Sequence, residues 1–325
     1  MKLQIYFLIP FLTAFLFSCS DDNKTLKPSY VDVNWFEIKD GPNETDHLRY
    51  EIYTSTGISL FYSDTLGKQF RGYDGFGDSI IHHEILNPYY MISSSSGDIS
   101  YVFSSNQVAI RQKMIFLRDQ VIPLLERVMY PRSFLIVEEL TLNASATEAA
   151  GNRKGNVYRG MMTTLVSRAS EIGAMNATDR RLLAAEIAGE LWGIYVEMEY
   201  GGKLAEFYAV SDNGVTWPAN ASTRTTYNRN VMTAPTQYEI PYMDHWNGYG
   251  FLLRNPDIIS NPGLPRLVYY TPTQKQDVCS FIQAVLLYTE AEFRAQYESV
   301  VGFNLLLTKY RLMKELVDTI KINHY

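Results

Sequence analysis

The sequence predicts an α+β fold in which a small sheet is surrounded by helices. β-rich runs concentrate in residues 31–105, helical periodicity dominates residues 106–325, and short strand-like runs recur within the helical part. With 325 residues, of which 46% are hydrophobic and 20% charged, the chain is long enough to bury a substantial core. We therefore expect one ordered domain over residues 31–325.

The N-terminal part of this domain is predicted to contain a hairpin. The stretch LRYEIYTSTGISLFYSDTLG (48–67) has two β-rich runs on either side of Ser55-Thr56-Gly57, which is the pattern of two strands joined by a turn. YDGFGDS (73–79) is predicted to be a loop. It is not a dinucleotide-binding fingerprint, because no third glycine opens a helix after it.

Helical periodicity begins near Asn106. Apolar residues recur every three or four positions in QVAIRQKMIFLRDQVIPLLERVMYP, with a kink or break expected at Pro123. The later elements are expected in this order: a strand over 133–142, a turn and another strand over 151–166, a helix over 179–200, a loop-rich stretch over 201–270, and helices over 272–294 and 296–320.

The N-terminus is typical of an exported protein. Residues 1–18 contain a short apolar run that ends in small residues, which predicts a secretory leader rather than a membrane-spanning helix. LFSC (16–19) resembles a bacterial lipobox, so we expect Cys19 to be lipidated and residues 19–30 to form a polar tether. Asp21 and Asp22 resemble the export signal of surface lipoproteins. The expected location is the outer membrane, lipid-anchored and facing the cell surface.

Charge and histidine content exclude several functions. The formal net charge of −6 and the isoelectric point near 5.5 do not support binding to nucleic acid. Only five histidines are present, and His82-His83-Glu84 is followed by Asn87-Pro88, which disfavours a helix with two zinc ligands on one face. We expect these two histidines in a partly exposed loop or strand.

The helix over 179–200 holds the most informative pattern. Its apolar residues at helical spacing predict one buried stripe, made of Leu183, Ile187, Leu191, Ile194 and Met198. Three glutamates, Glu186, Glu190 and Glu197, follow a line beside this stripe, and three small residues, Ala185, Gly189 and Gly193, follow a third line. Spacing alone indicates solvated or ion-paired glutamates and a small-residue ridge that packs closely against a neighbour.

The order of several segments resembles a known family. FLRDQVIPLLERVMYPRSFLIVEEL, LRNPDIISNP with TPTQKQDVCSFIQAVLLYTEAEF, and the closing LLLTKYRLMKELVDTIKINHY are similar to segments of the substrate import-associated zinc metallohydrolase lipoproteins. These are zinc-binding metallopeptidases of zincin-like fold, encoded beside starch-utilisation-type outer-membrane uptake proteins. The resemblance covers about residues 48–325 and implies a zincin-like domain.

The same resemblance implies that the zinc site is degenerate here. The family motif H-E-x-x-H falls on residues 185–189, so Glu186 matches the general base, while Ala185 and Gly189 stand where the two imidazole ligands are expected. The carboxylate ligand falls near Ser280, with Asp277 close by. Catalytic zinc needs three protein ligands and an open position for water. We therefore expect no bound zinc and no other cofactor.

The predicted function is that of a non-catalytic surface lipoprotein. It would act as a binding or scaffolding accessory of a TonB-dependent transporter and its substrate-binding lipoprotein, with a glycan or peptide as ligand and Glu190, Trp246 and Tyr249 as possible cleft residues. The alternative is an active hydrolase that retains metallopeptidase activity or uses Glu186 and Glu190 with Asp277. A third possibility is an interaction module that binds no small ligand.

Overall fold

The computed structural model describes residues 33–88, 99–143, 153–214, 224–227, 230–231, 246–253 and 269–323. The chain divides into two units, Met1–Trp35 and Phe36–Tyr325, and every helix and strand named below belongs to the second. The expected leader, the lipidated Cys19 and the tether lie outside the described residues. No helix in the described ranges is long and apolar enough to cross a membrane.

The central sheet has the strand order β1-β5-β9-β8. β1 (Ser59–Phe61), β5 (Ser133–Ile136) and β9 (Thr164–Val166) are parallel, and β8 (Val157–Arg159) pairs antiparallel with β9. The residues of β1, β5 and β9 are all buried, as expected for parallel strands covered on both faces. In β5, Phe134 and Ile136 belong to the larger hydrophobic core, while Leu135 belongs to a second core on the opposite face.

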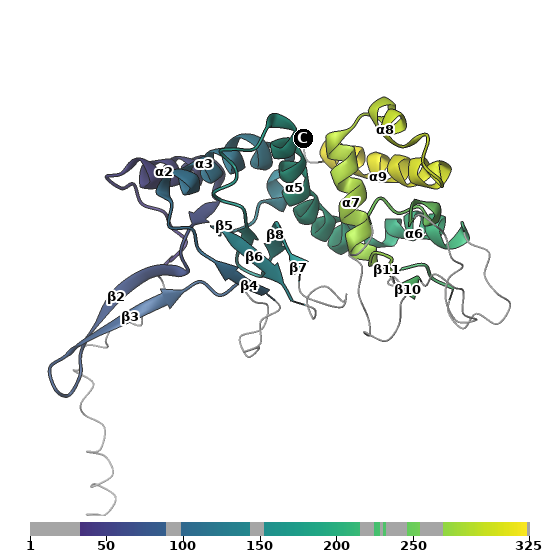
Figure 1. Ribbon diagram of the computed structural model, residues 1–325. Helices are drawn as coiled ribbons and strands as arrows, with labels where there is room; N and C mark the ends of the chain where they lie inside the picture. Colours follow the sequence, from purple (N-terminus) through teal and green to yellow (C-terminus); the bar gives the residue numbers. More distant parts are fainter. Residues whose placement is uncertain are drawn as a thin grey trace, which may run out of the picture. The chain divides into compact units, whose positions relative to one another are not determined.

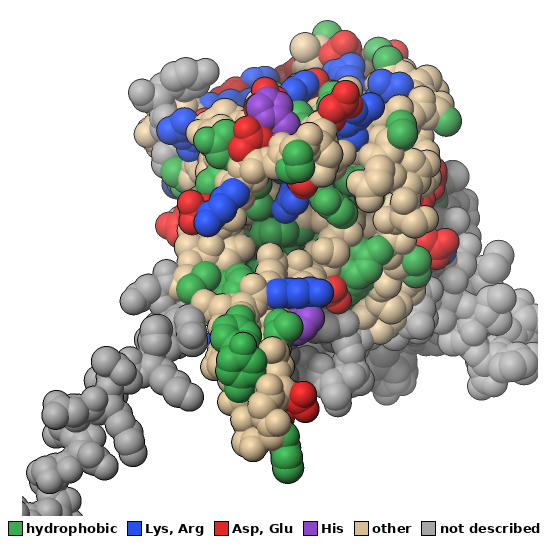
Figure 2. All heavy atoms as spheres, turned by 90° about the vertical axis from the view of Figure 1, so that its left-hand side faces the viewer, with side chains coloured by type: hydrophobic (Ala, Val, Ile, Leu, Met, Phe, Trp, Pro, Cys, Tyr) green, Lys and Arg blue, Asp and Glu red, His purple; other side chains and the backbone are tan. Residues whose placement is uncertain are grey.

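Smaller sheets flank this centre. β4 (Ile99–Val102), β6 (Glu139–Leu142) and β7 (Arg153–Lys154) form an antiparallel sheet, and β10 (Asn230–Val231) pairs with β11 (Tyr269–Tyr270). β2 (Thr65–Tyr73) and β3 (Ser79–Ile85) form a long hairpin. Figure 2 shows hydrophobic side chains gathered on this projecting hairpin, and the exposed ones are Phe70, Tyr73, Phe76, Ile80, Ile81 and Ile85.

The helices pack in two groups along the chain (Figure 1). α2 (Glu44–Thr56) and α3 (Gln107–Phe116) lie on one side of the strands, and α3 continues as a π-helix (Leu117–Val121) and a short 3₁₀ turn (Ile122–Leu124). The long α5 runs beside α7, and the remaining helices follow near α7. Their bounds are α5 Ala177–Tyr200, α6 Leu204–Asn213, α7 Gln274–Leu287, α8 Glu290–Tyr297 and α9 Phe303–Asn323, with 3₁₀ turns at Arg127–Met129, Gly201–Lys203 and Trp246–Tyr249.

The predicted α+β class is confirmed, but the first expected hairpin is wrong. Residues 44–56 form α2, because the Asn43 side chain accepts a hydrogen bond from the Asp46 backbone N–H and caps the helix. Gly57, which was expected in the middle of a β-turn, instead ends this helix in the left-handed conformation at φ 78°. The region 31–105 therefore contains a helix in addition to β1–β4.

The C-terminal helix boundaries also differ from the prediction. The expected helix over 272–294 is interrupted between α7 and α8, because Thr289 and Glu292 form a capping box that starts a new helix. The expected helix over 296–320 corresponds to α9, which begins at Phe303. The break near Pro123 is confirmed, since α3 has already changed to a π-helix and then to a 3₁₀ turn there.

Candidate functional site

Helix α5 carries the predicted site residues through the middle of the domain. It begins at Asn176, whose side chain accepts a hydrogen bond from the Asp179 backbone N–H. Leu183, Ile187 and Leu191 are buried as predicted, but Met198 is 75% exposed. The expected stripe is therefore wrong at its C-terminal end, where Trp192 and Val196 are buried instead.

The small-residue ridge of α5 packs against α7. A Cβ atom at Gly189 would lie 3.1 Å from the Cys279 carbonyl oxygen, and one at Gly193 would overlap the Cys279 Sγ. Close approach of the two helices thus accounts for both glycines, which otherwise cost a helix about 1 kcal/mol each relative to alanine. The backbone and side chain of α7 occupy the space that a side chain at residue 189 would need.

A pocket of about 350 Å³ lies beside this helix contact. Its polar lining comes from the β7–β8 region, from α5 and from α7, and the residues that carry it are Arg153, Lys154, Asn156, Glu186, Glu190, Gln276, Ser280 and Gln283. Three of these side chains are carboxamides, each with both hydrogen-bond donors and an acceptor. We call this the Glu186 pocket.

Glu186 is held on one side of the pocket by a single amide. Asn156 Nδ2 donates to Glu186 Oε2 at 2.8 Å. Burial raises the pKa of Glu186, and the hydrogen bond from Asn156 opposes this shift by favouring the charged form. Glu190, one turn further along α5, adds to the rise through its own negative charge and lies 3.7 Å from Lys275 Nζ.

Arg153 supplies a cation to the pocket lining. Its Nε is buried and has no hydrogen-bond partner in the described part of the chain. Burial lowers the pKa of Arg153, while Glu190 and Glu186 raise it through their charges. The pocket thus combines a guanidinium, whose Nε has no hydrogen-bond partner in the described part of the chain, with two carboxylates and three carboxamides.

The residues aligned with a zinc site do not supply a ligand set. Ala185 has no donor atom and is buried, and Gly189 lies against the Cys279 carbonyl. Ser280 lines the pocket, but its hydroxyl donates to the Asp277 carbonyl at 2.8 Å. Within the described ranges, no three His, Cys, Asp or Glu side chains are grouped closely enough to hold a metal ion.

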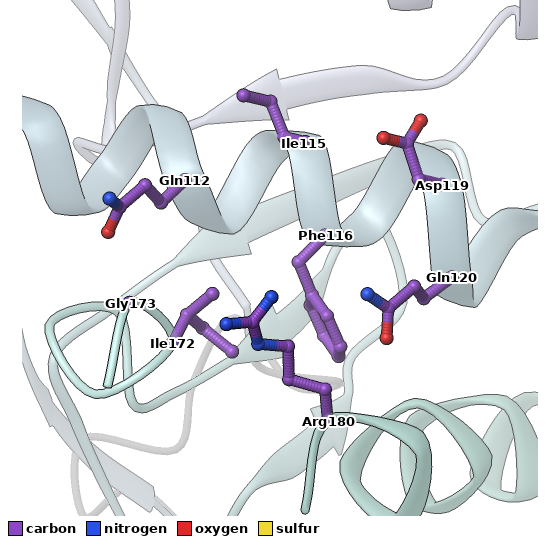
Figure 3. Close-up of a pocket in the computed structure, with 8 residues that line it drawn as sticks. All are labelled: Gln112, Ile115, Phe116, Asp119, Gln120, Ile172, Gly173 and Arg180. Atoms are coloured by element: carbon purple, nitrogen blue, oxygen red, sulfur yellow. The ribbon is translucent and has the colours of Figure 1, made fainter. Parts of the chain in front are cut away.

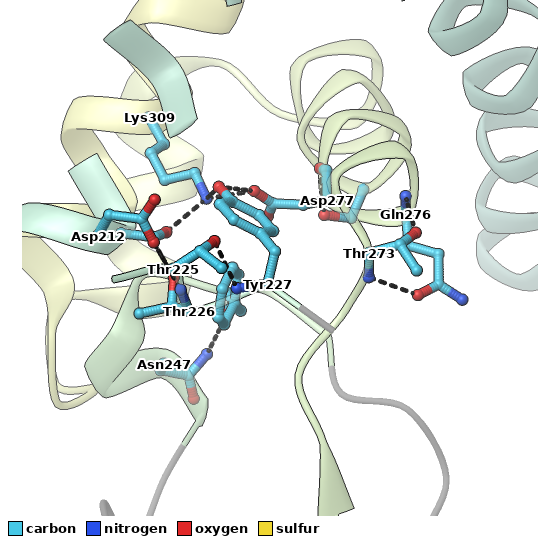
Figure 4. A network of polar contacts seen from close by, with 12 residues as sticks. Asp212, Thr225, Thr226, Tyr227, Asn247, Thr273, Gln276, Asp277 and Lys309 are labelled. Atoms are coloured by element: carbon cyan, nitrogen blue, oxygen red, sulfur yellow. Dashed lines mark hydrogen bonds and ion pairs between the residues drawn. The ribbon is translucent and has the colours of Figure 1, made fainter. Parts of the chain in front are cut away.

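Asp277 lies on the other face of α7, within a buried polar network (Figure 4). It forms an ion pair with Lys309 and accepts a hydrogen bond from the Tyr227 hydroxyl at 2.8 Å. Lys309 Nζ also donates to Ser211 Oγ at 2.9 Å, and four aromatic rings, Phe207, Tyr227, Phe251 and Phe281, surround it at 4.4 to 5.5 Å. Asp277 and Lys309 are both fully buried. Asp277 does not join Glu186 and Glu190 in the pocket.

Trp246 and Tyr249, expected as cleft residues, do not line the Glu186 pocket. Tyr249 is fully buried, and Trp246 Nε1 donates to the Leu252 carbonyl at 3.3 Å. Of the segment 246–253, it is Leu253 that lines the pocket. His82 and His83 lie on β3 as predicted, and His82 is bound to Glu84 at 2.9 Å.

Lys113 of α3 is a buried cation that the sequence pattern did not reveal. Its Nζ has no hydrogen-bond partner among the described residues and lies 4.9 Å from the centre of the Phe116 ring. Burial, helped by the charge of Arg168, lowers the pKa of Lys113 to about 7. The negative charge of Glu186 opposes this shift, so Lys113 is electrostatically coupled to the pocket.

No family model matches the sequence, and comparison with curated proteins and with solved structures finds no similar protein.

Proposed function

We propose that this protein is a surface lipoprotein whose zincin-like domain binds a polar ligand in the Glu186 pocket and does not hydrolyse it. In this proposal the protein serves an outer-membrane TonB-dependent uptake system, and the ligand is a glycan or a peptide. The observation that supports it best is the combination of an amide-lined pocket with donor-free residues at the aligned metal positions.

The pocket lining favours a ligand that is rich in hydrogen-bonding groups. Asn156, Gln276 and Gln283 can each donate and accept, which matches sugar hydroxyls or the N–H and C=O groups of a peptide backbone. Ligand sites need only a few such groups in fixed places to orient their ligand. Asn156 is fixed in this way, because its amide is already oriented by Glu186.

The described residues of the pocket offer no evident hydrolytic arrangement. Glu186 and Glu190 come from the same side of one helix, so they do not flank a bond as the two carboxylates of a glycosidase do. Cys279 is a poor nucleophile, because burial raises the pKa of its thiol and keeps it protonated. Water near Glu186 would lack the activation that a bound zinc ion supplies.

Binding and turnover can be separated in one experiment. Purified mature protein is titrated by calorimetry with a panel of oligosaccharides and peptides, and each ligand is recovered and analysed by mass spectrometry after prolonged incubation. We expect saturable binding of at least one ligand, which is recovered intact. Asn156→Leu should weaken binding about tenfold, because it removes a hydrogen-bonding group from the pocket and the hydrogen bond that orients Glu186.

The matched control is Asn304→Leu, the same chemical change at an exposed position on α9 outside the pocket. It should bind as the wild type does. Cleavage of a panel ligand that is abolished by Glu186→Gln would refute the proposal and establish the hydrolase alternative. Absence of any binding across the panel would favour an interaction module without a small ligand.

A further inference from the structure

A second, smaller pocket lies where the π-helix after α3 faces the start of α5 (Figure 3). Its volume is about 180 Å³, and it shares no lining residue with the Glu186 pocket. Phe116 and Ile172 are buried and contribute its apolar surface. The polar groups around them are the Arg180 guanidinium and the carboxamides of Gln112 and Gln120.

These three polar side chains are available to a ligand. Arg180 uses its Nε to donate to the Met175 carbonyl at 3.0 Å, which fixes the guanidinium plane. In the described part of the chain, its two terminal nitrogens and the two glutamine amides have no hydrogen-bonding partner. Figure 3 shows the Arg180 guanidinium and the Gln120 amide directed toward the space around the Phe116 ring.

The π-helix accounts for the position of Gln120. Along a regular α-helix, residues four apart are displaced by about 40° around the axis, so Gln112, Phe116 and Gln120 would drift off one line. The π-helix over Leu117–Val121 has i→i+5 hydrogen bonds and therefore more residues per turn, so each residue rotates less around the axis. After Phe116 the rotation over four residues then falls short of a full turn, which brings Gln120 back toward the line of Gln112 and Phe116. Single π-turns of this kind are often found at functional sites.

Gly173 makes room for the second amide. A Cβ atom at this residue would lie 2.6 Å from Gln112 Oε1 and 3.3 Å from its Cδ. The backbone of Gly173 is not in a left-handed conformation, so glycine is not required there for conformational reasons. The missing side chain lets the Gln112 amide lie beside Ile172 at the pocket.

We propose that this second pocket binds a hydroxylated monocarboxylate, namely a sugar acid of the hexuronate type. The two terminal nitrogens of Arg180 can hold a carboxylate with two parallel hydrogen bonds. Gln112 and Gln120 can both donate to and accept from hydroxyl groups. The volume suits one sugar unit, because it is below the roughly 300–1,000 Å³ of sites for drug-sized ligands.

The charge distribution favours a sugar acid over an amino acid. Asp119 also borders the pocket, but both of its oxygens are bound to Arg118, at 2.6 and 3.1 Å. Figure 3 shows its carboxylate directed away from Arg180. The described lining therefore leaves no free anion for an ammonium group, whereas Arg180 remains free for a carboxylate.

The test is saturation-transfer NMR and calorimetry on the mature protein, with D-glucuronate and D-galacturonate as probes. D-Glucose and D-galactose are the neutral comparisons, and N-acetyl-alanyl-alanine supplies a peptide carboxylate. We expect at least one uronate to bind about tenfold or more tightly than its neutral counterpart, since a charge-assisted bidentate pair is lost in the latter. The peptide should bind more weakly than the uronate.

Two variants connect this binding to the pocket. Arg180→Gln should weaken uronate binding at least about tenfold, while Arg127→Gln, the same change at an exposed arginine outside the pocket, should leave it unaltered. Gly173→Ala keeps all charges and should still weaken binding by displacing the Gln112 amide. Circular dichroism checks that each variant is folded. Equal binding of neutral sugar and uronate, unchanged binding in folded Arg180→Gln, or tighter binding of the peptide would overturn the proposal.

Discussion

Two regions of this molecule each contain a fully buried lysine and a carboxylate whose charge acts on it, but the arrangement differs. Asp277 is fully buried, whereas Glu186 is half-buried. In the network of Figure 4, Asp277 and Lys309 are in direct contact and are enclosed by aromatic rings. Around the Glu186 pocket, Glu186 is bound to Asn156, and Lys113 has no hydrogen-bond partner among the described residues. In the first region the two charges pair directly, although Asp277 Oδ1 has no hydrogen-bond partner among the described residues. In the second region neither Lys113 Nζ nor Arg153 Nε has such a partner in the described part of the chain.

This difference indicates separate roles. Buried charges that pair directly can join distant segments, and Lys309, Asp277 and Tyr227 connect α9, α7 and the 224–227 segment. Burying an amine without a partner reduces stability, so stability alone does not explain Lys113. Polar groups of this kind are more typical of sites that serve a function.

The largest expected change in stability comes from breaking the buried ion pair of Asp277 and Lys309. Lys309→Met leaves Asp277 buried without its counter-ion, which should cost about 3–5 kcal/mol of unfolding free energy. The measurement is urea denaturation followed by circular dichroism. The double variant Asp277→Leu with Lys309→Met should recover most of the loss, because it removes both charges. A Lys309→Met protein as stable as the wild type would show that the network does not stabilise the fold.

Removing Lys113, whose amine has no hydrogen-bond partner among the described residues, is expected to raise stability rather than lower it. Lys113→Met replaces a buried amine by an apolar side chain of similar length and should raise the unfolding free energy by about 1–4 kcal/mol. The same denaturation measurement checks this. A loss of stability in Lys113→Met would mean that Lys113 has a favourable interaction in the fold, and the comparison of the two lysines would fail.

Lys113 also makes the stability of the folded protein depend on pH. Its pKa is about 7 in the folded protein and 10.5 in the unfolded chain, so only the unfolded chain binds the proton between these values. The contribution of Lys113 therefore makes the wild type less stable as the pH falls from about 10 to about 7, and the penalty is complete below the folded pKa. Lys113→Met should show a flatter stability profile over this window.

A smaller effect is expected where α5 touches α7. Gly193→Ala places a methyl group on the Cys279 Sγ, and overpacking of this kind costs about 1–3 kcal/mol, partly offset by the better helix propensity of alanine. Adding Cys279→Ala should restore stability, because it removes the sulfur. The same second change should not rescue Gly189→Ala, whose methyl would meet the Cys279 carbonyl. Rescue of both glycine variants, or of neither, would contradict the packing described here.

The sequence predicted the elements whose periodicity is long and regular. α5 and α9 were recognised because their core residues repeat at helical spacing, as Leu183, Ile187 and Leu191 do. The region of α2 was mistaken for a hairpin, because its tyrosines and threonines are frequent in strands and only Leu48 and Ile52 are buried. The signals in the sequence that favour a helix there are Asn43, which can cap its start, and Gly57, which can end it in the left-handed conformation.

The candidate site was only partly accessible to sequence reasoning. Glu186, which falls in the aligned motif, Ser280, which falls near the aligned carboxylate position, and Glu190, expected as a cleft residue, all line the Glu186 pocket. Asn156 could not be found, because it reaches Glu186 from the segment between β7 and β8 through tertiary packing alone. Lys113 of α3 could not be found either, because only the charge of Glu186 links it to the pocket. Asp277 was expected near the glutamates, but one helix exposes different residues on its two faces, and Asp277 lies on the face toward Lys309.

Zinc stoichiometry tests the central claim most directly, namely that the Glu186 pocket is not a metal centre. The mature protein is equilibrated with excess Zn²⁺, freed of unbound metal, and analysed by inductively coupled plasma mass spectrometry beside the variant Glu186→Gln. Because Ala185 and Gly189 offer no donor atoms, we predict far less than one zinc per chain in both proteins. One tightly held zinc per wild-type chain that is lost in Glu186→Gln would contradict the account.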